Sequence, residues 1–385
     1  MDIAVFSSPL LEGSIKRDRL SGNTVENKGD CLVRDYNLLG DSGRRAVETG
    51  LASAQWYHTD ISRADMKALM KRSDGPALRD SAIYYGAMIV TLVCGILLWG
   101  SWWCVPFWIA YGVLYGSGSD ARWHEGGHGT AFKTPWMNEV IYQIACFMIV
   151  RNPSTWRWSH FRHHTDTVIV GRDPEIALMR PPAVWRALSN VVGLHDMYAG
   201  LSRMLLNASG TLADDEKTFV PEDEWHKVVR VARIWCAIYA ATILAAIAMG
   251  SILPLMVIGL PRLYGAWHFI MTGFLQHGGL ADNVLDHRLN TRTVYMNPVT
   301  RFLYMNMNYH IEHHMFPLVP FHRLPELHER IKHDLPPPSP SIFSAYREMI
   351  PIIWRQFRGE DVYIRRDLPA SAQPYREDLH SRALG

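Results

Sequence analysis

Long uncharged stretches are the feature that most restricts the fold of this chain. No residue from Ala82 to Gly100 is charged, and the apolar character resumes from Trp102 to Ser119. A second pair of apolar stretches runs from Ile234 to Met249 and from Ile252 to Phe274. Since an α-helix needs about 20 apolar residues to cross the hydrocarbon core of a bilayer, these stretches predict two membrane hairpins.

The charges around the hairpins predict their orientation. Basic residues flank the apolar stretches, whereas neither hairpin turn contains a lysine or an arginine. By the positive-inside rule, both turns face outward and both chain termini lie in the cytoplasm. Arg262 interrupts the fourth stretch, so its side chain must face the bundle interior or a wet cavity, unless the helix already leaves the bilayer there.

The predicted fold class is an all-α membrane protein, with four transmembrane helices in two hairpins and a cytoplasmic helical cap. Residues 336–340 are rich in proline, and Ser341 is expected to cap a last helix from Ile342 to about Arg358, kinked at Pro351. The expected parts are a cytoplasmic N-terminal segment (1–80), the first hairpin (81–119), a cytoplasmic segment (120–233), the second hairpin (234–275), a further cytoplasmic segment (276–335), and a linker, helix and tail (336–385).

Composition excludes two broad classes of protein. Of the 385 residues, 48% are hydrophobic and the net charge is only +2, which argues against a disordered chain and against an electrostatic nucleic-acid binder. The five cysteines include no pair at the spacing of a disulfide or a metal site, so we expect reduced thiols.

Histidine is unusually abundant, with 18 residues, and eight of them form three clusters. Within each cluster the histidines lie three or four positions apart, so on a helix they share one face and point toward a common centre. Eight neutral imidazoles exceed the needs of one four-coordinate zinc, and they predict two metal ions with open coordination positions. The clusters are His124 and His128, then His160, His163 and His164, then His310, His313 and His314.

His277 is the expected ninth ligand. At the rise of an α-helix, the paths from Ser101 to His124 and from Ser251 to His277 are both about 35–39 Å long. Both helices should therefore present a histidine at a similar height below the bilayer. His287 is the alternative ninth ligand, whereas His268 is expected to form a hydrogen bond within the bundle.

With its hairpins and its HxxxH, HxxHH and HxxHH boxes, the chain resembles the membrane fatty-acid desaturase and hydroxylase family over residues 45–335. Residues 156–160, 171–175 and 308–317 are most similar to a bacterial branch that includes rhizopine oxygenases and dihydrorhizobitoxine desaturases. The resemblance implies a bacterial inner-membrane protein with a cytoplasmic non-haem di-iron centre that uses O2 and two electrons. Some relatives place an asparagine one turn before the ninth histidine, where this chain has Gly273.

Carboxylates near the boxes are expected to accept the free ring N–H of the metal ligands, with surface salt bridges as the alternative role. Arg157 and Arg162 are expected to pair with such carboxylates. The candidates are Glu125, Asp173 and Glu312, together with Asp166, Glu175 and Asp282.

The expected reaction is O2-dependent desaturation of an acyl chain or of a small amino-acid-like substrate, with hydroxylation by a monooxygenase as the alternative. No Rieske, haem or flavin motif is present, so we expect an external ferredoxin, rubredoxin or cytochrome-like donor with its reductase, docking on the basic cytoplasmic face. Residues 124–128 also fit the HExxH motif of zinc proteases, with Glu125 as general base. A metal transporter is disfavoured because the first three apolar stretches contain no ionisable residue.

Overall fold

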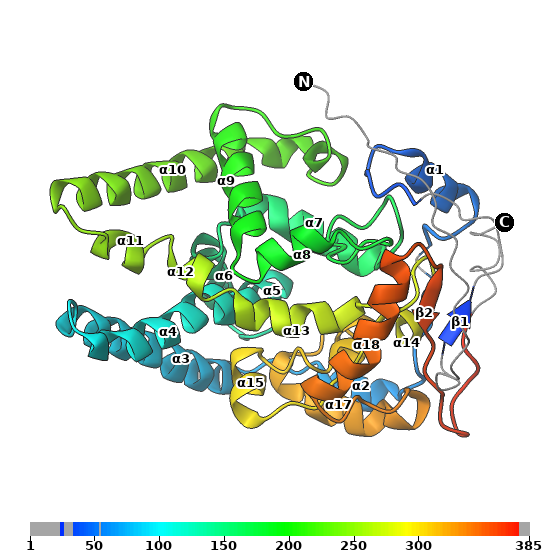
Figure 1. The fold of residues 1–385 in the computed structure, drawn as a ribbon. Helices are drawn as coiled ribbons and strands as arrows, with labels where there is room; N and C mark the ends of the chain where they lie inside the picture. Colours follow the sequence, from blue (N-terminus) through cyan, green and yellow to red (C-terminus); the bar gives the residue numbers. More distant parts are fainter. Residues whose placement is uncertain (1–23, 27–33, 54, 377–385) are drawn as a thin grey trace.

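The computed structural model describes residues 24–26, 34–53 and 55–376, which are mostly helical (Figure 1). The expectation that both termini are cytoplasmic falls on residues outside these ranges. Two segments of the described chain, residues 63–97 and 222–248, are long and apolar enough to cross a membrane. They contain the first and third of the four predicted spans.

The first hairpin pairs two helices. Helix α3 (Asp74–Leu97) lies beside α4 (Val105–Val113), and both project from the body of the molecule (Figure 1). Helix α4 continues through a single π-helical turn, Leu114–Gly118, into α5 (Ser119–His128). The second apolar stretch is therefore a helical segment that leads directly into the first histidine cluster.

The second hairpin differs from the prediction of two long helices. Helix α10 (Trp225–Ala248) is continuous, but the fourth stretch is divided into α11 (Leu253–Val257), α12 (Pro261–Tyr264) and α13 (Trp267–His277). The expected single helix from Ile252 to Phe274 is thus wrong. Gly259 has a φ of +97°, which is not helical, and Pro261 follows it without a backbone N–H to continue the helix.

A close backbone contact fixes this break against the first hairpin. A Cβ atom at Gly265 would lie only 1.7 Å from the carbonyl oxygen of Gly112 in α4. Since no side chain fits there, the glycine lets α12 and α4 approach at backbone distance.

The remaining helices form the body that carries the histidines. Ser341 accepts a hydrogen bond from the N–H of Ser344 at 3.0 Å, which confirms the predicted cap of α18, and Pro351 lies inside that helix. A two-stranded antiparallel sheet of β1 (Thr24–Glu26) and β2 (Val362–Ile364) was not expected in an all-α fold. The helices are α1 (Asp41–Glu48), α2 (Arg63–Leu69), α6 (Pro135–Met148), α7 (Pro153–Thr165), α8 (Val184–Asn190), α9 (Leu194–Ala208), α14 (His287–Asn290), α15 (Pro298–Leu303), α16 (His310–Met315), α17 (Leu324–Ile331) and α18 (Ile342–Phe357).

Arg262 is fully buried in the protein interior, as the sequence predicted. Its guanidinium donates to the carbonyl oxygen of Gly116 and to the carboxylate of Asp120, and at 3.2 Å to Asp196. Asp120 also pairs with Arg151 at 3.2 Å. This network ties α12 and α9 to the beginning of α5, one helical turn before His124.

Removing this guanidinium should destabilise the fold. The variant Arg262→Met is expected to lower the free energy of unfolding by about 3–5 kcal/mol, because Asp120 would lose its closest cation while staying buried. Adding Asp120→Asn should recover part of that loss. Thermal unfolding in detergent measures both effects. The unfolding is monitored through the labelling of the thiols of Cys104 and Cys146, which are buried in the folded protein.

Arg203→Gln is the matched control, because Arg203 pairs with Asp215 where the two side chains are 42% and 37% exposed. An exposed pair contributes about 0–1 kcal/mol, so this variant should unfold close to the wild type. Equal losses for the two arginine variants would contradict a structural role of the buried network.

Candidate metal centre

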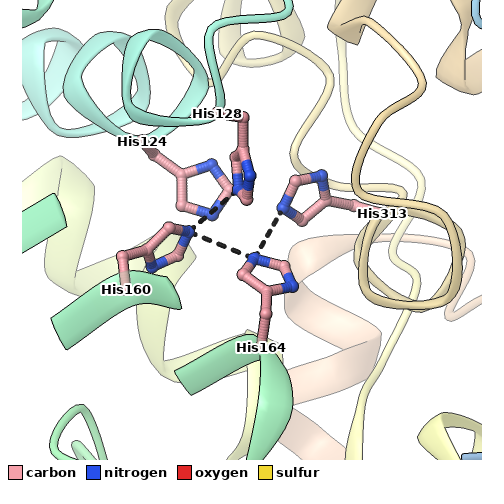
Figure 2. A group of neighbouring side chains, drawn as sticks. All are labelled: His124, His128, His160, His164 and His313. Carbon is pink, nitrogen blue, oxygen red and sulfur yellow. Dashed lines mark hydrogen bonds between the residues drawn. The ribbon is translucent and has the colours of Figure 1, made fainter. Parts of the chain in front are cut away.

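Five of the predicted ligands converge on one point from three helices. Their nearest ring nitrogens all lie within 4.8 Å of one another. Figure 2 shows the rings turned toward one another, from α5 at the top, α7 below and α16 at the side. This first histidine group consists of His124, His128, His160, His164 and His313.

A second histidine group forms next to the first. It contains His163, His277 and His314, whose ring nitrogens also lie within 4.8 Å of one another. The Nε2 atom of His310 is 3.1 Å from the Nε2 atom of His314. Eight of the nine predicted ligands therefore lie in the two groups, and His310 lies beside the second group. His268 lies outside both groups.

His287, the alternative to His277, also lies outside both groups. Its ring stacks on Trp56 with centroids 4.2 Å apart, and its centroid is 5.1 Å from that of His314. The structure thus places His277, and not His287, with the other ligand candidates.

The spacing of the ring nitrogens fits a metal centre. The Nε2 atoms of His128 and His160 are 3.0 Å apart. Those of His160 and His164 are 3.1 Å apart, and those of His164 and His313 are 3.2 Å apart. Two nitrogens at right angles, each about 2.1 Å from one ion, are about 3.0 Å apart. In addition, several buried ring nitrogens have no hydrogen-bond partner within the described chain, namely Nδ1 of His124, His164, His310 and His313, and Nε2 of His277.

Two carboxylates orient histidines of α7. The Nδ1 atom of His163 donates to Asp173 at 2.9 Å, and that of His160 donates to Glu175 at 3.0 Å. Because an ionised carboxylate only accepts, the proton stays on Nδ1 and the lone pair of Nε2 faces the centre. Asp173 itself accepts the N–H of Val168 at 2.7 Å, which holds the carboxylate in place.

Two other contacts that orient the imidazole rings could not be predicted from the sequence. The Nδ1 atom of His277 donates to the carbonyl oxygen of Asn290 at 2.9 Å, which leaves Nε2 free to bind a metal. The hydroxyl of Thr167 is 3.2 Å from Nδ1 of His314. A backbone carbonyl and a threonine distant in sequence cannot be recognised from the spacing of the boxes.

The other candidate carboxylates have different partners. Glu125 accepts from the hydroxyl of Thr130 at 2.7 Å and from the N–H of Phe321 at 3.2 Å. Glu312 contacts His328, which belongs to neither histidine group, and accepts from Thr293. These carboxylates connect loops to the helices that carry the ligands.

Ion pairs involve two more of the candidate carboxylates and the two arginines near the second cluster. Asp166 pairs with Arg162 at 3.3 Å, as expected, and Asp282 pairs with Arg34 at 2.6 Å. Arg157 pairs with Glu139 of α6, which is not one of the candidate carboxylates.

Burial keeps most of these imidazoles neutral. It lowers the pKa of His128 to about 4 and, together with the nearby His163, lowers the pKa of His277 to about 3. Burial acts in the same direction on His163, but the carboxylate of Asp173 outweighs it and raises the pKa of His163. Neutral imidazole is the form that binds metal ions, so the groups are prepared for a cation at neutral pH.

Cavities reach the histidines from two sides. The inner cavity, of about 210 Å³, is lined by five of the candidate ligands and by Gly273, where an added Cβ atom would lie 3.3 Å from the ring of Phe269. The opposite cavity, of about 900 Å³, is lined by His128, His164 and His314 and by aromatic side chains such as Trp158 and Phe161. Small molecules therefore have room on either side of the two groups.

Comparison with known proteins identifies the family. The sequence model of the fatty acid desaturase family matches residues 100–346, more than half of the chain. An sn-2 acyl-lipid omega-3 desaturase (ferredoxin) of Arabidopsis thaliana is 23% identical over 89% of this chain and 79% of its own length. An acyl-lipid omega-3 desaturase (cytochrome b5) of the same plant is 23% identical over 61% of this chain and 65% of its own length.

A Delta(12) acyl-lipid conjugase of Impatiens balsamina is also 23% identical, over 70% of this chain and 74% of its own length. The chain spans between 59% and 79% of the length of the curated relatives that it matches. The family match includes all three histidine clusters and His277, and thus every residue of the two groups as well as His310. On this ground the chain belongs to the fatty acid desaturase family, whose members are membrane-associated oxidoreductases of lipid metabolism.

Proposed function

We propose that the chain is a membrane-bound non-haem di-iron desaturase that introduces a carbon–carbon double bond into an acyl chain or a small amino-acid-like substrate. The observation that carries this proposal is the convergence of nine histidines, eight in two adjacent groups and His310 beside the second, within a chain of this family. When bound, two iron ions would supply the activation of O2 that is needed to remove hydrogen from an unactivated C–H bond.

The chain's own contribution is to hold the ligands and their protons. Asp173 and Glu175 keep protons on Nδ1 of His163 and His160, so both rings present Nε2 to the centre. The carbonyl of Asn290 does the same for His277. The proposed ligands are His124, His128, His160, His163, His164, His277, His310, His313 and His314.

The membrane arrangement of this proposal has four spans in two hairpins and a cytoplasmic cap that holds the histidines. Two long apolar helices and the paired projection of α3 with α4 and of α10 with α11 support it (Figure 1). Both the cytoplasmic orientation and the six-part division of the chain follow from the flanking basic residues. The bacterial branch and the inner membrane rest on sequence motifs alone.

An external carrier completes the proposed reaction. The names of two relatives specify ferredoxin and cytochrome b5 as donors, so an electron carrier of this kind, a ferredoxin, rubredoxin or cytochrome, is proposed here as well. The opposite cavity is lined by Arg157 and Arg172, each paired with a carboxylate, and by Phe161, which is 63% exposed. This exposed aromatic side chain beside ion-paired residues would suit contact with a carrier protein.

Desaturation is favoured over hydroxylation because the relatives are named as desaturases and a conjugase. The zinc-protease alternative would require Glu125 as a general base. Since one zinc ion would not need the three histidine clusters that converge here, we do not propose the protease.

Metal analysis tests the centre directly. The purified wild-type chain is expected to contain two iron ions per chain, and His277→Ala or His313→Ala should lower that content, because each variant removes one ligand. Elemental mass spectrometry gives the ratio of metal to protein. His226→Ala, an exposed histidine of α10, is the control and should keep both ions. One zinc ion per chain would contradict the proposal and favour a protease, and a weakly held, exchangeable metal would favour a transporter.

The carboxylate beside His163 should tune metal affinity. Asp173→Asn is expected to weaken iron binding by about 10- to 100-fold, because a neutral amide polarises the Nδ1–H of His163 less and makes Nε2 a weaker ligand. Competition with a chelator measures the change without any turnover. Asp214→Asn, at an exposed carboxylate paired with Lys217, is the control and should leave the affinity unchanged. An equal loss in both variants would argue against a role of Asp173 at the centre.

Product analysis tests the reaction. In cells that express the chain, mass spectrometry should detect a product lighter than its substrate by the mass of H2, whereas a product heavier by one oxygen atom would show hydroxylation. With purified components, an NAD(P)H-fed reductase should sustain turnover only after a small electron carrier is added. Turnover with the reductase alone would refute the need for a carrier.

A further inference from the structure

Arg186 of α8 lies where two cavities meet. It lines the inner cavity, which reaches the histidines, and an outer cavity of about 440 Å³. Both cavities also share Arg151, Trp156 and Asp196 as lining residues. Arg186 therefore lies beside both the outer cavity and the cavity that reaches the histidine groups.

Arg186 differs from the other charged residues of these two cavities. In the described part of the chain, each of the other aspartates, glutamates and arginines that line them has a charged or hydrogen-bonding partner. Arg151 pairs with Asp120, Asp196 with Arg262, and Arg203 with Asp215, whereas Asp173 and Glu175 accept from histidines. Arg180 pairs with Asp361. The guanidinium of Arg186 has no hydrogen bond or ion pair with any described residue, although the residue is partly buried.

An unpaired cation that is partly withdrawn from water gains by binding an anion. His195 lines the outer cavity, and burial together with the charge of Arg186 lowers its pKa. A neutral His195 can add a hydrogen bond without adding charge. The two side chains could therefore hold a phosphate or a carboxylate group at the junction of the cavities.

The surface around Arg186 points to a lipid as the source of that anion. The neighbouring side chains of α8 and α9 form an apolar face, on which Trp185 is 84% exposed and Tyr198 is 73% exposed. Leu188, Leu194 and Leu205 on the same face are also more than half exposed. Tryptophan and tyrosine beside leucine on an exposed helix face are typical of a helix in the membrane interface.

The position of α9 relative to α10 also fits a location at the membrane interface. Helix α9 lies across α10 (Figure 1), and Arg233 of α10 donates to the carbonyl oxygen of Ala208 at the end of α9 at 3.0 Å. The apolar stretch of α10 begins at the next residue, Ile234. The apolar face of α8 and α9 therefore lies at the level where α10 would enter the bilayer.

The inner cavity offers a place for the acyl chain. Beside the histidines it is lined by the apolar side chains of Ile176, Phe269 and Phe274. A lipid whose headgroup stays at the interface beside Arg186 would thus direct its acyl chain along apolar side chains toward the histidine groups.

We infer that Arg186 binds the anionic headgroup of a membrane lipid and thereby selects phosphate-bearing acyl lipids as substrates. This inference rests on the proposed function, because it assigns the substrate of that same site. The recognising chemistry is a guanidinium that forms charge-assisted hydrogen bonds to anionic oxygens, which a neutral lipid lacks.

Binding to the full-length protein with its metals, in the absence of an electron donor, tests the inference. Phosphatidylglycerol and a diacylglycerol with the same acyl chains are presented in nanodiscs, and decanoate serves as the water-soluble anion. Native mass spectrometry should show about tenfold tighter binding of phosphatidylglycerol than of diacylglycerol. Arg186→Gln should remove this preference, and Arg186→Lys should keep most of it because the charge remains.

Lys217→Gln is the control, because it removes a surface charge outside both cavities and should leave the preference unchanged. A full wild-type preference in Arg186→Gln, or an equal loss in Lys217→Gln, would overturn the inference. Binding of decanoate that depends on Arg186, without any preference for phosphatidylglycerol, would overturn the lipid source and indicate a soluble acid. Because binding is measured without turnover, an inactive enzyme that keeps the preference would count against the proposed function alone.

Discussion

Nine imidazoles can share one small buried volume only if their ring nitrogens are held in one orientation, and this constraint governs the rest of the structure. Burial and neighbouring histidines lower the pKa values of most of these rings, so protonation cannot relieve the crowding at neutral pH. The remaining means of stabilisation are fixed partners at Nδ1 and a cation between the Nε2 atoms. Asp173, Glu175 and the carbonyl of Asn290 are such partners; the two carboxylates come from a loop and Asn290 from α14, not from the helices that carry the histidines.

The break in the fourth apolar stretch lies next to its buried arginine. A charged side chain that faces lipid is costly, so Arg262 needs partners inside the protein. The break around Gly259 and Pro261 and the close approach of Gly265 to α4 bring the guanidinium to Asp120. Asp120 lies one turn before His124, so the feature that interrupts the span also anchors the helix of the first histidine cluster.

Local periodicity made the convergence of the histidines predictable, whereas long-range contacts were not predictable. The offsets of three and four residues placed His124 with His128, and His310 with His313 and His314, on single helix faces. Helical length likewise pointed to His277 at the end of α13. By contrast, the sequence could not distinguish Asp173, which supports a ligand, from Glu312, which contacts His328. That difference depends on how loops fold back over the helices.

The two sides of the histidine groups offer different surroundings, which bears on how the proposed reaction is organised. The inner cavity contacts His277 and His310 and leads to Arg186 and the apolar face of α8 and α9. The opposite cavity contacts His128 and His164 and is also lined by Arg157 and Arg172. A carrier protein at this cavity would therefore contact other residues than a substrate in the inner cavity. Only a few residues line both cavities, and one of them is His160, so the carboxylate of Glu175 that orients this imidazole helps to shape both cavities at once.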